Sequence, residues 1–206
     1  RYQNDIGDVV KSPGWRYFEE TQKTQKTNDA VKVRFDIEHD DIYMHLFVPE
    51  GISREYTQAL APPTREAKNG YVDKKTQVLA IRQEGEAWDN PFIGVFEPSK
   101  NENASIKTVV PLKDGTKTIG AIVTSQVGDL QIKDIVISQD NKEASYKNEE
   151  LKLSFKGRFG IVRTVAGDGT TKVVLYMGEG EELQFGKKEL NSNTANKGVL
   201  RYNLED

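Results

Sequence analysis

The chain has 206 residues, no cysteine, a formal net charge of -3 at pH 7 and a mean hydropathy of -0.66. The lack of cysteine excludes a disulfide framework and thiolate chemistry. The weakly acidic balance gives no electrostatic footprint for nucleic acid or for an anionic membrane surface, and no apolar run approaches the roughly 18 residues that cross a bilayer. We therefore expect neither nucleic acid nor a membrane as a partner.

Short runs of alternating apolar and polar residues recur along the chain, with β-branched and aromatic residues at the apolar positions. This period of two predicts half-buried β-strands, and many short strands with few helices predict an all-β fold, an antiparallel β-sandwich of supersandwich-like type with a smaller C-terminal β unit. The predicted strands cover residues 31–37, 42–48, 76–82, 92–96, 105–111, 118–124, 130–138, 151–155, 160–165, 172–177, 183–185 and 199–204.

Turn signals separate these runs. Asp-Gly pairs at 114–115 and 168–169 supply the positive φ that tight hairpins need, and Gly-Glu-Gly at 178–180 is interpreted as a further turn. Residues 19–28 are too polar for a helix and are expected to be irregular, and residues 51–75 are expected to form a long loop.

The domain organisation follows from these loops. We predict an irregular N-terminal lead-in over residues 1–29, a main sandwich over 30–140 and a C-terminal β unit over 141–206, packed on the sandwich or continuous with it. The solvated stretch 140–150 is the predicted boundary, because it combines charge with a lack of apolar periodicity.

Tyr43 and His45 are the first candidates for chemistry. They alternate with Met44, Leu46 and Val48, so they point to the face opposite this apolar set and lie about 7 Å apart, at two strand steps. A Tyr/His pair can serve acid–base catalysis. The alternative is a half-buried sheet face that neighbouring strands or another domain cover.

A second group of candidates points to carbohydrate. Trp88 lies in a polar loop, where an indole can stack on a sugar ring or fold back over the end of the sheet. Tyr56 is a further candidate for an exposed aromatic ring, and Arg65 can meet a carboxylate or sulfate group.

An acidic run comprises Asp36, Glu38, His39, Asp40 and Asp41 and suggests a metal site. It lacks the glycine-permitted bend of a calcium loop, so a solvated turn is the preferred interpretation. We expect no metal and no cofactor.

Several strand motifs resemble one family. They are MHLFVP at 44–49, PPTR at 62–65, VLAIRQ at 78–83, PFIGVFEP at 91–98, GRFG at 157–160 and LYMGEG at 175–180. In this order they are similar to the β-sandwich region of heparinase II/III-like polysaccharide lyases, over most of residues 30–185.

The resemblance implies a larger enzyme in which an α-helical toroid precedes β-sandwich domains. Enzymes of this family cleave uronic-acid polysaccharides by β-elimination. In such enzymes a Tyr and a His commonly act as acid and base, while Asn, His or Arg neutralises the uronate carboxylate. No catalytic motif of the family maps onto Tyr43, His45 or another position here. We therefore expect a non-catalytic portion, downstream of a catalytic domain that this chain lacks, and a periplasmic or extracellular location.

Three functions compete at this point. The first is a β-sandwich portion that supports the catalytic domain or the substrate cleft, which predicts a sizeable apolar patch where that domain would dock. The second is an independent carbohydrate-binding module with exposed aromatic residues. The third is a small self-contained lyase that uses Tyr43 and His45.

Overall fold

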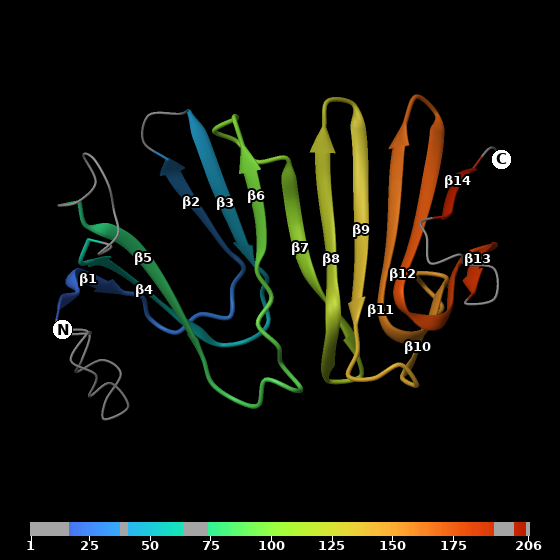
Figure 1. The fold of residues 1–206 in the computed structure, drawn as a ribbon, viewed down its shortest axis with the longest axis horizontal. Coiled ribbons are helices and arrows are strands. Elements are labelled where there is room, and N and C mark those ends of the chain that lie inside the picture. The colour runs from blue at the N-terminus through green and yellow to red at the C-terminus, as the bar shows by residue number, and fades with distance from the viewer. Residues whose placement is uncertain (1–16, 38–40, 64–73, 192–199, 205–206) are drawn as a thin grey trace. The chain divides into compact units, whose positions relative to one another are not determined.

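The computed structural model describes residues 17–37, 41–63 and 74–191, and the backbone of 200–204. These residues form strands in antiparallel sheets and contain no α-helix (Figure 1), which confirms the predicted all-β antiparallel class. The strands are β1 (Glu19–Lys23), β2 (Val31–Ile37), β3 (Ile42–Val48), β4 (Arg54–Ala61), β5 (Thr76–Gln83), β6 (Val95–Ser99), β7 (Ile106–Asp114), β8 (Lys117–Val127), β9 (Leu130–Ser138), β10 (Ser145–Asn148), β11 (Leu153–Gly167), β12 (Thr170–Phe185), β13 (Lys188–Asn191) and β14 (Leu200–Leu204).

The chain divides into two compact units. The first contains residues 1–28 and 52–85, and its sheet has the strand order β1-β4-β5. The second contains residues 29–51 and 86–206, with a three-stranded sheet of order β2-β3-β6 and an eight-stranded sheet whose main path is β13-β12-β11-β9-β8-β7. In the larger sheet β10 also pairs with β11, and β14 pairs with β12.

Two segments that were expected to be irregular are strands of the first unit. β1 lies in the predicted lead-in, and β4 lies in the predicted long loop. β1 is a polar edge strand with mostly exposed side chains, so it shows no apolar alternation. β4 contains few β-branched residues and is held by full pairing with β5, from Arg54 opposite Gln83 to Ala61 opposite Thr76. Ladder pairing thus outweighed local preference in both cases.

One face of the eight-stranded sheet builds the main hydrophobic core. Ile135, Ile137 and Val162 are at most 1% exposed there, and Leu175 opposite Val162 is fully buried. The remaining core residues come from the strands of the same sheet, β10 and β13 included: Leu112, Ile119, Tyr146, Leu153, Phe155, Val173, Leu183 and Leu190. Burial of this apolar set is the dominant favourable contribution to the stability of the unit.

The Asp-Gly turns are confirmed. Gly115 and Gly169 have φ of 59° and 71°, where glycine is favoured because it has no Cβ. The two turns join β7 to β8 and β11 to β12, and the residues on either side of each turn pair directly, Asp114 with Lys117 and Gly167 with Thr170.

The predicted turn at 178–180 is wrong, because these residues lie inside β12. A Cβ added at Gly157 on β11 would lie 2.4 Å from the Cα of Gly180. The β11–β12 register also shifts on both sides of Gly157. The glycines of the GRFG and GEG motifs therefore allow two backbones to approach closely at a β-bulge.

The stretch 140–150 is more ordered than the sequence indicated. It contains β10, and Tyr146 on that strand is 4% exposed within the core. β9 and β11, on either side of this stretch, are paired neighbours in one sheet. The domain division at residues 29 and 140 stays a prediction.

Candidate functional site: an apolar groove on the eight-stranded sheet

A groove of about 940 Å³ lies on the second unit, on the face of β8, β9 and β11 opposite the main core. The ladder aligns its floor in cross-strand rows. Val123 lies opposite Asp134, which lies opposite Arg163, and Val136 on β9 lies opposite Ile161 on β11. Residues two apart on a strand share a face. The same alternation that buries Ile135 in the core therefore presents Asp134 and Val136 to the groove.

Aromatic side chains from residues 87–98 border the groove. Trp88 is 76% exposed, Phe92 58% and Phe96 61%. The loop that carries Trp88 is fixed by the Asp89 backbone, whose carbonyl oxygen accepts a 3.0 Å hydrogen bond from the Thr118 N–H on β8. Large exposed apolar side chains that cluster around one concavity are typical of a binding surface.

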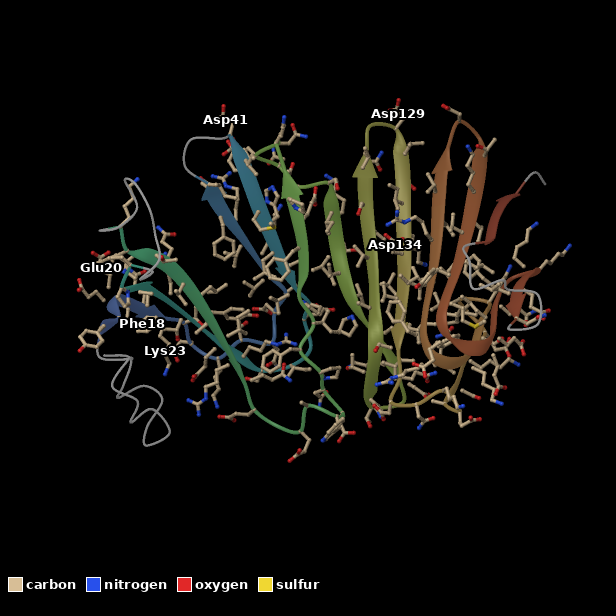
Figure 2. All side chains as sticks on the ribbon, in the orientation of Figure 1. Phe18, Glu20, Lys23, Asp41, Asp129 and Asp134 are labelled. Atoms are coloured by element: carbon tan, nitrogen blue, oxygen red, sulfur yellow. The ribbon has the colours of Figure 1, made fainter. Side chains whose placement is uncertain are left out.

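The described cations of the groove each have a carboxylate partner. The Arg163 guanidinium donates two hydrogen bonds to Asp134, from Nε at 2.6 Å and from Nη2 at 2.9 Å. The hydrogen bond to Asp134 raises the pKa of Arg163. Lys117 donates a single hydrogen bond to the carboxylate of Asp140. Figure 2 shows Asp134 on β9, near the middle of the strand.

Glu97 adds a third carboxylate to the groove, and it is also satisfied within the protein. It accepts backbone N–H hydrogen bonds from Ser105 at 2.8 Å and Ile106 at 3.0 Å. Burial alone would raise the pKa of this carboxyl, but the hydrogen bonds from Ile106 and Ser105 outweigh burial and lower it. The charged groups of the groove are thus paired or hydrogen-bonded within the protein, and most of the other lining residues are apolar.

The structure brings Tyr43 and His45 together, as their spacing predicted. Their rings stack with centroids 6.3 Å apart and an interplanar angle of 28°. His45 is fully buried, with Nε2 3.2 Å from the carbonyl oxygen of Asn101, and the guanidinium of Arg34 lies 5.3 Å from the centre of the Tyr43 ring. His45 thus lies in the interior and Tyr43 is half-buried beside it, and a role of the pair in proton transfer stays a prediction.

The carbohydrate candidates separate in space. Trp88 lies on the groove with an exposed ring. Tyr56 is only 5% exposed, which corrects its prediction as an exposed aromatic ring. Burial raises the pKa of the Tyr56 hydroxyl, with the charge of Arg54 acting against this effect. Arg65 lies outside the described residues.

For the acidic run, the structure describes only the ends. Asp36 accepts hydrogen bonds from Arg34, at 2.7 Å from Nε and 3.2 Å from Nη2. Asp41, labelled in Figure 2, is the turn residue directly before β3. Residues 38–40 lie outside the described part of the chain. Across the described residues, no group of three or more acidic or histidine side chains has the arrangement of a metal site.

Sequence reasoning missed most of the groove. Phe92 and Phe96 were recognised only as part of a strand motif, and Asp134 and Arg163 were not recognised as a pair. The alternation of residues along a strand shows which side chains share a face. It does not predict the strand order that aligns β8, β9 and β11 and brings Asp134 next to Arg163.

No helix within the described residues is both long enough and apolar enough to cross a bilayer.

Comparison with known proteins indicates the class of protein to which the chain is similar. Residues 106–202, which include β7 to β9 and the β11–β12 hairpin, match the family described as endo-acting ulvan lyase C-terminal domain. The all-β fold and this match together support a C-terminal portion of a polysaccharide lyase.

A full-length relative extends the match beyond that domain. The chain is 54% identical over 195 residues to an endo-acting ulvan lyase of Formosa agariphila. The matched segment covers 95% of this chain and 24% of the relative. The chain thus spans about a quarter of the length of that relative. No solved structure matches the chain.

Proposed function

We propose that the chain is the non-catalytic C-terminal β portion of a polysaccharide lyase that acts on a uronic-acid polysaccharide such as ulvan, and that it supports the catalytic region of that enzyme. The observation that carries the proposal is the 54% identity over 95% of the chain to an endo-acting ulvan lyase four times longer than the match. Such identity over nearly the whole chain argues for the same place in the same kind of enzyme.

The geometry agrees with a non-catalytic role. β-Elimination next to a uronate needs a base, an acid and a group that offsets the carboxylate charge. Among the described residues of the groove, both cations are engaged by carboxylates and there is no histidine. His45 is fully buried, away from a position where it would meet a polymer. The groove is therefore built for contact rather than for proton abstraction.

Two finer statements belong to the same proposal. The motifs at 91–98 and 157–160 support a heparinase II/III-like type of lyase, with a helical catalytic region ahead of this portion. A substrate too large to enter a cell supports a periplasmic or extracellular location. Fractionation of the native cells, with an antibody raised against the chain, tests the second statement, and recovery in the cytoplasm would contradict it.

The experiment on function is an absorbance assay for the unsaturated uronate that β-elimination creates. We expect no product from the chain alone with ulvan, heparan sulfate, alginate or chondroitin. We expect product when the chain replaces the matched 195 residues of the Formosa lyase. Product from the chain alone that disappears in the His45→Ala variant would overturn the proposal and establish a self-contained lyase.

An independent carbohydrate-binding module is the second candidate, and one observation favours it. The Trp88 indole is 76% exposed at the groove, as a sugar-stacking ring would be. Affinity electrophoresis of the chain in gels that contain ulvan tests it. Retardation that is lost in Trp88→Ala and kept in Tyr176→Ala, whose ring lies on β12 outside the groove, would favour this candidate.

A further inference from the structure

The groove combines exposed aromatic rings with an apolar floor. Trp88, Phe92 and Phe96 are each more than half exposed, and Val136 and Ile161 form part of the floor between β9 and β11. In proteins of this size large exposed apolar surfaces usually mark an interaction site. The question is which class of partner covers it.

The charges argue against a polyanionic sugar as the partner. A uronate chain is recognised by cations that are available to its carboxylates. In the described lining, Arg163 and Lys117 are committed to Asp134 and Asp140, and Glu97 adds a further negative charge. A polyanion would have to displace an internal carboxylate at each cation. An apolar protein surface requires no such exchange.

The arrangement of charge also fits a protein interface. Interface cores are depleted of charge and enriched in aromatic residues, and their polar groups are satisfied. The Arg163–Asp134 pair and the hydrogen-bonded Glu97 meet that description. The rings of Trp and Phe are among the side chains that are enriched at interface cores.

We propose that this groove is the docking surface for the preceding region of the same polysaccharide lyase. The inference rests on the proposed function, and the relative supplies the candidate partner because about three quarters of its length lies outside the match. The docked region presents an apolar, weakly charged surface to Trp88, Phe92 and Phe96. Docking fixes the C-terminal portion to the enzyme through one face of its sheet, and the opposite face remains its own core.

Hydroxyl-radical footprinting read by mass spectrometry tests the proposal on two intact proteins. One is this chain, and the other is the Formosa lyase in which the matched residues are replaced by this chain. We expect oxidation of Trp88, Phe92 and Phe96 to be roughly fivefold slower in the full lyase, since rings at an interface core are desolvated. Val110 is the internal reference and keeps its rate, because it is exposed on β7, outside the groove, in the row of Ile122 and Ile135 on the core face.

Equal oxidation rates of the three rings in both proteins would overturn the inference. So would protection that needs ulvan, which would make the groove a sugar site. Protection that appears in the chain alone as its concentration rises, together with a dimer in sedimentation velocity, would also overturn it by making a second copy the occupant.

The Phe92→Ser/Phe96→Ser double variant adds a second readout. We expect the melting temperature of the full lyase to fall, while that of the chain alone stays within about 1 °C because these rings contact solvent there. Val110→Ser, at an exposed valine of β7 outside the groove, leaves both unchanged. An unchanged melting temperature of the full lyase in the double variant would contradict docking.

Failure of the inference and failure of the proposed function are distinguishable. If the chimaeric lyase is active and the chain alone is not, the proposed function holds whatever the footprint shows. If the rings are equally oxidised in that active lyase, only the docking surface is wrong.

Discussion

The two faces of the eight-stranded sheet show how the same strands serve two purposes. On β9 and β11 the residues Ile135, Ile137 and Val162 are at most 1% exposed and build the core. The intervening Asp134 and Arg163 form a hydrogen-bonded ion pair in the open groove, where Arg163 is about half exposed. The difference teaches that the larger buried cluster lies on one face. The other face buries Ala121 and Val123 in a second cluster with Phe47, and its groove extends over β9 and β11, where a partner can make contact. Four predictions test this division.

The largest effect belongs to the core face. Leu175→Ala removes a fully buried side chain opposite Val162, and we expect a loss of about 3 kcal/mol in the free energy of unfolding, because lost burial and the cavity add together. Urea unfolding monitored by circular dichroism measures it as a lower midpoint at unchanged slope. A loss near that of the surface control Val110→Ser would mean that this face does not hold the unit together.

The ion pair of the groove floor has a smaller effect. Arg163→Met removes both hydrogen bonds to Asp134, whose side chain is 14% exposed, and we expect a loss of about 1 kcal/mol, moderated by solvent around the exposed arginine. Adding Asp134→Asn should recover part of the loss, because no charge is then left without a partner. The same urea experiment checks both variants. A loss as large as that of Leu175→Ala would contradict the division between the faces.

Glu97 makes the stability of the fold depend on pH. Its folded-state pKa lies below the ordinary value of 4.5, so its ionised form contributes stability above that value, and the contribution is lost as the pH falls through the folded pKa. Glu97→Gln keeps the shape and removes the charge. We expect the stability difference between wild type and variant to be present at pH 7 and to shrink as the pH falls below 4.5. A difference that is constant from pH 7 to pH 3 would show that Glu97 does not titrate in this way.

The smallest effect on stability is expected for Trp88, at the border of the groove. Trp88→Ala removes a ring that is 76% exposed, so the free energy of unfolding of the chain alone should change by no more than about 0.5 kcal/mol. Urea unfolding at matched protein concentration tests this expectation. A loss above 1.5 kcal/mol would mean that the ring packs on the sheet in solution and belongs to the fold.

Sequence periodicity predicted most strands and failed at identifiable places. β2, β3 and β9 have the predicted bounds because their apolar and polar residues alternate cleanly. β1 is polar on both faces, and β10 has a single core residue, Tyr146, so neither carries a periodic signal. β12 continues through Gly178 and Gly180 because strand pairing around a bulge outweighs their local preference for a turn.

The candidate site was predicted only in part, because local sequence does not specify how distant strands pack. Trp88 was recognised because an indole in a polar loop is unusual, and it does border the groove. Tyr56 has a similar local sequence character but is buried, and only the packing of β4 decides that. The partners of Arg163 and Lys117 lie 29 and 23 residues away, and a separation of that kind cannot be inferred from a period of two.

The sequence by itself determined that the chain is all-β, where its hairpins turn at Asp-Gly, and which residues of a strand share a face, because these depend on backbone sterics and on local alternation. Only the tertiary structure decided which face became the core and which the groove. That choice depends on the order in which distant strands pair, since pairing sets the rows from Val123 through Asp134 to Arg163 and leaves Trp88, Phe92 and Phe96 exposed beside them.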